Sequence, residues 1–143
     1  MQSKLDKAIK KLHDENLCCV VIKGDECFTS TDFGIKPLMI FLRQDQHFFQ
    51  NAVIADKIIG KAAALLMILG GAEQVYGEVM SEAAIGVLEV NSIDYKYGET
   101  VPYIKNRTDT GMCPMEETVK NISSPKEAFD ALEKTIAILM SKK

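Results

Sequence analysis

The chain has 143 residues, of which 47% are hydrophobic and 26% are charged, and its formal net charge at neutral pH is −3. These proportions are typical of a soluble globular domain and exclude a disordered or membrane-embedded chain. Lysines and arginines are spread among acidic residues, so polymeric nucleic acid is not an expected partner. A small anionic ligand remains compatible with this charge, because a local pocket can be positive on a mildly acidic protein.

The N-terminal segment carries no apolar run behind its lysines, so no signal peptide is expected and the cytoplasm is the expected compartment. The longest apolar stretch, residues 62–69, is shorter than the roughly 20 residues that span a bilayer, and no membrane contact is expected. The length fits a single domain over residues 1–143. The cysteines lack CxxC spacing and are expected to be free thiols: Cys18, Cys19, Cys27 and Cys113.

The first part of the chain predicts a helix, a hairpin and a second helix. Apolar residues at helical spacing predict a helix over about residues 2–14. The β-branched run at 17–24, a Gly-Asp turn and the extended stretch at 26–30 predict a β-hairpin. A helix is predicted over about 34–44, where Pro37 is tolerated only in the first turn.

The middle of the chain predicts a strand at 52–55, a helix at about 60–69 and a strand at 74–79. Two strands joined by one helix are parallel, and the crossover is almost always right-handed. The helix is apolar nearly all round, which is typical of a helix buried between a sheet and other elements, and Gly70-Gly71 should end it.

The last part predicts a helix over about 81–90 with Ser81 as its N-cap, a strand over 93–97, a polar stretch and a short helix over about 114–120. Ser124 and Pro125 then begin a final helix. Its expected buried stripe is Phe129, Leu132, Ile136, Leu139 and Met140. The alternation of helices and strands predicts an α/β fold, a three-layer α/β/α sandwich with a mixed sheet.

Two segments of the chain resemble a known family. These are ADKIIGKAAALLMILGGAEQVYGEVMSEAA at residues 55–84 and YGETVPYIKNRTDTGMCPMEE at residues 97–117. Both resemble the signature of the domain of unknown function 1893 family, which lies within the cytidine-deaminase-like superfamily. A helix, a hairpin and two strand-helix units are also the element order of that fold. The resemblance implies a cytidine-deaminase-like fold and no particular activity.

The zinc site of the deaminases is not matched. Zinc deaminases place a His or Cys with a nearby Glu at the first crossover helix and PCxxC at the next. Residues 56–58 read Asp-Lys-Ile and residues 79–83 read Val-Met-Ser-Glu-Ala at those positions. The His-Asp-Glu at 13–15 has H-x-E spacing, but it ends the first helix, and a zinc site needs three or four converging ligands. No metal, no cofactor and no conventional hydrolytic deamination are therefore expected.

Charged residues gather where the parallel strands are predicted to end, which is where open α/β sheets bind ligands. Asp56 is a candidate general base, and Lys57 and Lys61, four residues apart, are expected on one helical face as candidate sources of positive charge. The alternative is that Asp56 caps the helix and the lysines are solvated. Ligand-binding candidates at the end of the next strand, expected within roughly 5 to 10 Å of the first group, are Glu78, Ser81 and Glu82.

The polar segment 99–113 approaches the length at which an irregular connection usually carries function. Its side chains offer donors for a carboxylate or phosphate, and its glycine allows close backbone approach. The ligand-binding candidates in and next to this segment are Asn106, Arg107, Thr108, Thr110, Gly111 and Glu116. Cys113 is a candidate nucleophile because a helix N-terminus lowers a thiol pKa, although Glu116 and Glu117 oppose a thiolate and a packed, inert thiol is the alternative.

Three functions fit these residues. The first is a small-molecule binder for a nucleotide-like or anionic metabolite, or a non-zinc enzyme, using the crevice at the strand ends. The second is a catalytically inactive regulatory or interaction module, in one form a homodimer, whose exposed apolar residues would include Phe48, Phe49 and Met80. The third is a thiol-dependent enzyme that uses Cys113.

Overall fold

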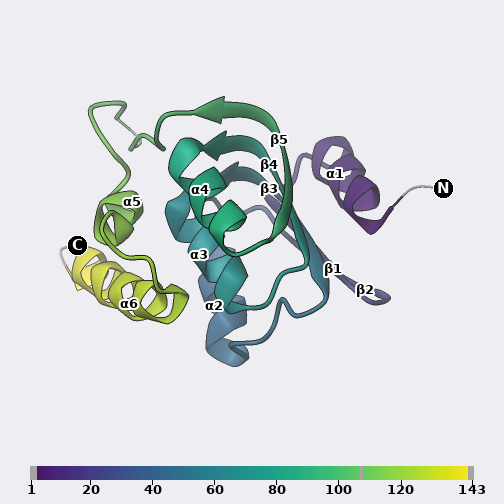
Figure 1. Ribbon diagram of the computed structural model, residues 1–143, viewed down its shortest axis with the longest axis horizontal. Coiled ribbons are helices and arrows are strands. Elements are labelled where there is room, and N and C mark those ends of the chain that lie inside the picture. Colours follow the sequence, from purple (N-terminus) through teal and green to yellow (C-terminus); the bar gives the residue numbers. More distant parts are fainter. Residues whose placement is uncertain (1–2, 107, 142–143) are drawn as a thin grey trace.

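The computed structural model describes residues 3–106 and 108–141, which form a mixed α/β fold on an open five-stranded sheet (Figure 1). The strand order is β2-β1-β3-β4-β5. The strands are β1 (Cys19–Lys23), β2 (Glu26–Ser30), β3 (Ala52–Ile59), β4 (Gln74–Ser81) and β5 (Asp94–Val101). β1 runs antiparallel to β2 and β3, while β3, β4 and β5 are parallel. The predicted hairpin and parallel strand pair are confirmed.

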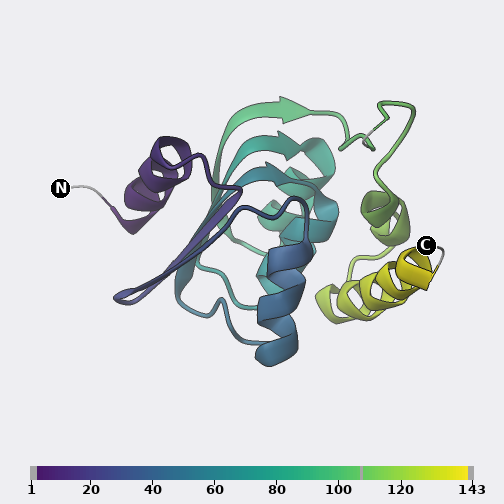
Figure 2. The same cartoon turned by 180° about the vertical axis from the view of Figure 1, so that it is seen from behind.

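Helices lie on both faces of this sheet. They are α1 (Lys4–Asp14), α2 (Lys36–Gln44), α3 (Lys61–Leu69), α4 (Glu82–Val90), α5 (Pro114–Val119) and α6 (Pro125–Ser141). α1 packs against β1, β3 and β4 on one face. α2, α3 and α4 cover the other face, and α5 and α6 lie outside α3 (Figures 1 and 2). The helices at the carboxyl ends of β3 and β4 thus share one side of the sheet with α5.

Two hydrophobic clusters lie on the two faces of the sheet. The smaller cluster joins the buried side of α1, including Leu5, Ala8 and Leu12, to Val20 and Val53 of the sheet. The larger cluster contains α3, whose residues 62–67 are all buried, together with residues of α2, α4, α5 and α6. The predicted burial of α3 is confirmed, and its apolar surface on every side follows from its place between the sheet and the outer helices.

Local sequence explains several helix ends. The Ser81 hydroxyl accepts a hydrogen bond from the Ala84 N–H at 3.1 Å, which confirms the predicted N-cap of α4. Gly70 is the C-cap of α3, and Gly71 follows with a φ of 88°, a left-handed conformation that glycine adopts without steric cost. At the start of α6, the Ser124 hydroxyl accepts a hydrogen bond from the Glu127 N–H at 3.4 Å, as predicted from the sequence.

The parallel strands continue further than predicted. β3 runs to Ile59 and β5 to Val101, so Asp56 and Lys57 lie within β3 and do not follow it. Polar side chains suggested earlier ends, but the pairing of Ile58 with Val79 extends the ladder. Backbone hydrogen bonds between neighbouring strands are available whatever the side chain is.

Two predictions about apolar surface are wrong. Phe49 and Met80 are fully buried, and Phe48 is half-buried in an aromatic cluster with Phe41. On α6, Leu139 and Met140 are exposed because the end of the helix extends past the core residues.

Within the described part of the chain, no helix is long and apolar enough to cross a bilayer.

Candidate functional site

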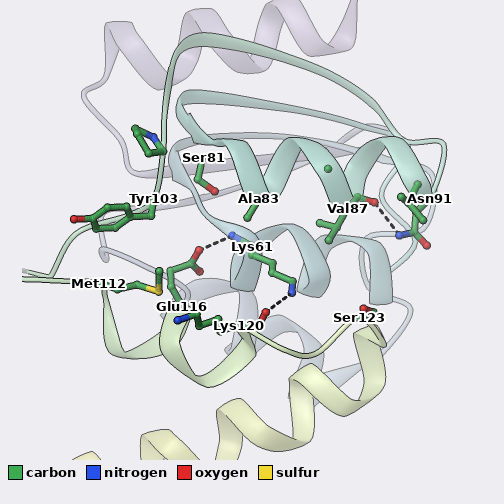
Figure 3. Close-up of a pocket in the computed structure, with 13 residues that line it drawn as sticks. Lys61, Ser81, Ala83, Val87, Asn91, Tyr103, Met112, Glu116, Lys120 and Ser123 are labelled. Carbon is green, nitrogen blue, oxygen red and sulfur yellow. Dashed lines mark hydrogen bonds between the residues drawn. The ribbon is translucent and has the colours of Figure 1, made fainter.

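A cavity of about 440 Å³ opens at the carboxyl ends of the three parallel strands (Figure 3). Each strand end contributes to it: Lys61 follows β3, Ser81 ends β4, and Tyr103 follows β5. α4 forms one wall and the segment containing α5 forms the opposite wall. The other lining residues are Ala83, Gly86, Val87, Val90, Asn91, Pro102, Met112, Glu116, Lys120 and Ser123.

The Glu116 carboxylate lies at the N-terminus of α3. Its Oε1 accepts the Lys61 N–H at 2.7 Å, and its Oε2 accepts the Ala62 N–H at 2.8 Å (Figure 3). The N-cap residue of α3 is Gly60, which makes no side-chain capping bond, and a Cβ there would lie 2.5 Å from Glu116 Oε1. Glu116 therefore caps α3 from a distant part of the chain, and Gly60 leaves the space for it.

Burial raises the pKa of Glu116 above the ordinary glutamate value. The hydrogen bonds from the Ala62 and Lys61 amides and the positive charge of Lys61 act in the opposite direction, because they favour the ionised form. The carboxylate is therefore held by donors that compensate its removal from water.

Two lysines give the cavity its positive charge. Lys61 Nζ donates a hydrogen bond to the Lys120 backbone oxygen at 3.1 Å, and the Lys120 side chain also lines the cavity. Both lysines line the cavity together with Glu116, whose carboxylate is already bonded to the backbone. A negatively charged ligand group would be attracted to this side of the cavity.

Asp56 is a second buried carboxylate, but it does not line the cavity. Its Oδ1 accepts the Ile58 N–H at 3.2 Å, and its Oδ2 has no hydrogen-bond partner within the described residues. Burial raises the pKa of Asp56 to about 7, while the Ile58 and Lys57 amides and the Cys19 thiol, opposite it on β1, partly oppose this rise. The alternative prediction that Asp56 caps a helix is wrong, because Asp56 lies within β3.

The predicted grouping of Lys57 with Lys61 is wrong. Lys57 lies in β3 and donates a hydrogen bond to Asn16 Oδ1 at 3.0 Å, beyond the end of α1. Glu78 Oε1 lies 3.5 Å from His13 Nε2 on the same side of the sheet. Because side chains alternate between the faces of a strand, strand residues at these positions reach α1 and not the cavity.

In the polar loop before α5, the described donor groups form hydrogen bonds with other groups of the same loop. Asn106 Oδ1 accepts bonds from the Thr110 N–H at 3.0 Å and the Thr108 hydroxyl at 3.2 Å, and the two threonine hydroxyls lie 2.8 Å apart. The Gly111 oxygen accepts the Asn106 N–H at 2.8 Å. These groups shape the turn and do not line the cavity, to which this loop contributes Met112. Arg107, also predicted to bind ligand, lies outside the described residues.

Cys113 and Glu82 lie near the cavity walls without lining the cavity. Cys113 is a half-buried residue at the N-cap of α5, and its side chain makes no capping bond. Glu82 is exposed in the first turn of α4. The thiol-dependent function therefore stays a prediction, which an iodoacetamide rate no faster than that of a free peptide thiol would contradict.

Residues 7–136 match the TM1506 family, described as Domain of unknown function (DUF1893). The chain belongs to this family. A search of curated proteins finds no match to it. Among solved structures, it is similar to the crystal structure at 2.70 Å resolution of a DUF1893 family protein (TM1506) from Thermotoga maritima. The TM-score is 0.82 at 24% sequence identity, over 100% of this chain and 92% of that chain, and this likeness supports the fold.

The sequence thus identified the DUF1893 family and three of the cavity residues, Lys61, Ser81 and Glu116. It missed Tyr103, which a correct end for β5 would have placed next to a strand end, and Lys120, the C-cap residue of α5. Among residues 3–106 and 108–141, no three His, Cys, Asp or Glu side chains gather where they could hold a metal ion.

Proposed function

We propose that this DUF1893 protein binds a small anionic, nucleotide-like metabolite in the cavity at the carboxyl ends of β3, β4 and β5. The observation that carries the proposal is the convergence of Lys61, Ser81 and Tyr103, one from each strand end, on a single cavity. Ligands in open α/β sheets bind outside these ends. The volume of about 440 Å³ falls in the range of roughly 300 to 1,000 Å³ that is usual for small-molecule sites.

The lining supports a ligand with an apolar, flat part and a negatively charged part. Val87, Val90 and Met112 supply apolar surface, and the ring of Tyr103 provides a face for stacking. Lys61 and Lys120 supply the positive charge. Binding is the function that this lining supports, because Asp56, Lys57 and Cys113, the other candidate catalytic groups, lie outside the cavity.

We also propose that the chain is a single domain of the three-layer α/β/α, cytidine-deaminase-like class. The order helix, hairpin, helix and then strand-helix units along an open mixed sheet supports this placement. The proposal includes no zinc and no zinc-dependent deamination, since residues 56–58 and 79–83 do not carry the His or Cys and the PCxxC of the zinc deaminases.

A thermal-shift panel of nucleosides, nucleotides and small phosphorylated metabolites tests the binding function. A ligand at about a hundred times its dissociation constant stabilises a protein by about 2.7 kcal/mol, which raises the midpoint by several degrees. The shift should be lost in Lys61→Ala and kept in Lys57→Ala, which removes the same side chain on the α1 side of the sheet. A panel without any shift, or a shift that Lys57→Ala removes and Lys61→Ala keeps, would contradict the proposal.

The association module is the second candidate, and α6 carries the observation in its favour. Ile138, Leu139 and Met140 are 55%, 40% and 64% exposed on the last turns of this helix. If they form a homodimer contact, Met140→Lys should convert a dimer to a monomer in analytical ultracentrifugation, while Lys57→Ala should not. A monomeric wild-type protein at high concentration would remove this candidate.

A further inference from the structure

β5 forms an open edge of the sheet. It pairs with β4 on one side, and within the described residues no strand pairs with its outer side (Figures 1 and 2). An edge strand presents a row of unpaired N–H and C=O groups, to which a strand of another chain can bind. β2 is the opposite edge, but it has five residues where β5 has eight. β5 therefore offers the longer edge for pairing.

Two opposite charges lie on the α1 side of this edge. Asp94 and Lys96 are exposed, and together with Leu5 and Gln74 they line a hollow beside the start of α1. Within residues 3–106 and 108–141, neither Asp94 nor Lys96 forms an ion pair. Charged side chains usually protect an edge strand from pairing. These two differ in sign and lie two residues apart on one face, so a second copy of the same edge can neutralise both.

The α4 side of the same edge carries apolar surface. Tyr95 and Tyr97 stack with their ring centroids 6.4 Å apart, and the Tyr95 hydroxyl donates a hydrogen bond to Glu89 of α4 at 2.7 Å. Tyr97 is 44% exposed, and Ile93, just before β5, is half-buried against the larger hydrophobic cluster. Aromatic and β-branched side chains form favourable pairs across neighbouring strands. A partner strand would therefore cover apolar surface on this face.

We propose that β5 binds the β5 strand of a second copy of this chain, antiparallel and about a two-fold axis at the level of Tyr95. The two five-stranded sheets then form one continuous sheet. Asp94 of each copy lies opposite Lys96 of the other, which makes two ion pairs on the α1 side. Ile93 of each copy lies opposite Tyr97 of the other on the α4 side. The same surface of both copies forms the contact, as in other two-fold dimers.

Charge selects this register among those that a two-fold axis allows. The axis stands perpendicular to the sheet, so each residue faces one from the same side of the strand and the axis lies at the level of a residue. An axis at Lys96 would place the two lysines opposite each other. An axis at Tyr97 would place Asp94 and Lys96 opposite uncharged residues. The axis at Tyr95 pairs both charges with their opposites.

The interface is separate from the cavity. None of the residues 93–97 lines it, whereas Pro102 and Tyr103, which do, follow the carboxyl end of β5. The inference therefore goes beyond the proposed binding function and does not depend on it. A dimer without any metabolite hit leaves the β5 contact, and a metabolite hit on a monomer leaves the binding function.

Sedimentation-velocity ultracentrifugation of charge-reversal variants tests the β5 contact. Lys96→Asp and Asp94→Lys each place like charges opposite one another twice, so each should raise the dissociation constant of the dimer by at least about tenfold. An equimolar mixture of the two variants should form a heterodimer, because every facing pair then has opposite signs. Lys36→Asp is the matched control and should dimerise as wild type does. It reverses the charge of an exposed lysine on α2, whose Phe41 packs on Phe28 of β2 at the other edge of the sheet.

Three outcomes would overturn the β5 contact. They are a wild-type protein that stays monomeric at high concentration, a dimer that both charge reversals leave intact, and a mixture of the two variants that stays monomeric. A dimer that Met140→Lys dissociates and Lys96→Asp does not would place the contact on α6 and also overturn it. If a charge reversal does not fold, Lys96→Gln and Asp94→Asn each remove one charge and should raise the dissociation constant by a smaller factor. No rise in either would count against the contact.

Discussion

Asp56 and Glu116 are both buried carboxylates near the carboxyl end of β3, with 4% and 8% of their surface exposed, but they have different partners. Each oxygen of Glu116 accepts a backbone N–H bond. Asp56 accepts the Ile58 N–H on Oδ1, and no partner of Oδ2 is found within the described chain. Glu116 joins α5 to the start of α3, which is far from it in the sequence. Asp56 instead places in the core a carboxylate whose removal from water costs free energy. The comparison shows that the donors around a buried carboxylate, more than its burial, decide whether it stabilises the fold.

Asp56→Asn should have the largest effect, and only at higher pH. Burial raises the pKa of Asp56 from 3.8 to about 7, so the folded protein holds a proton that the unfolded chain releases in this interval. The stabilising contribution of protonated Asp56 is present below about pH 4 and is lost as the pH rises through about 7. Since one pKa unit corresponds to about 1.4 kcal/mol, the loss is on the order of 4 kcal/mol.

Urea denaturation of Asp56→Asn at about pH 5 and about pH 8.5 measures this difference. The variant should gain stability relative to wild type as the pH rises. Asp25→Asn is the control, because Asp25 is exposed in the turn of the hairpin and the same charge is removed. A constant difference between Asp56→Asn and wild type at all pH values would show that Asp56 is ionised in the folded protein.

Glu116→Ala should destabilise the protein at neutral pH by about 3 kcal/mol, because two hydrogen bonds to a charged group are lost at the start of α3. Chemical denaturation gives this value. Glu117→Ala, in the same turn of α5 but exposed, should change the free energy of unfolding by less than about 0.5 kcal/mol. If the two variants were equally stable, Glu116 would not be the cap of α3.

Gly60→Ala should cost about 2 kcal/mol through overlap with the Glu116 carboxylate. The backbone of Gly60 is extended, with φ −95° and ψ −175°, so alanine adopts it without strain and the cost is steric. In the Glu116→Ala background the same substitution should cost less, and a double-mutant cycle measures the coupling. Additive effects would place the carboxylate away from Gly60.

Cys19→Ala should have the smallest effect, a further rise in the pKa of Asp56. The Cys19 thiol lies opposite Asp56 on β1 and favours its ionised form, so its removal leaves Asp56 with fewer compensating groups. A pH titration of the Asp56 carboxyl carbon signal by NMR measures the change. Cys18→Ala is the control, because the Cys18 thiol donates to the Thr31 oxygen. A fall in the Asp56 pKa in Cys19→Ala would contradict the expectation.

The secondary structure could be predicted to a large extent from neighbouring residues. The Ser81 cap, the apolar α3 and the Gly70-Gly71 end all depend on contacts within a few residues. The ends of β3 and β5 could not be predicted in this way, because pairing with β4 extends them past polar side chains. That error placed Lys57 on a helix with Lys61, although it lies on the α1 side of the sheet.

The candidate site was likewise predictable from the sequence only where neighbouring residues determine the structure. Family membership followed from the resemblance of two segments to the DUF1893 signature. The edge of the sheet that carries the cavity was predictable because hydrophobic periodicity and strand-helix alternation indicate the parallel strands. The partners of Glu116 could not be predicted from the sequence, because its bonds to Lys61 and Ala62 join residues 55 and 54 positions apart. Such bonds form only when α5 is packed against α3. Local patterns carry the information for helices, strands and caps, whereas long-range packing selects which buried charge receives donors and which does not.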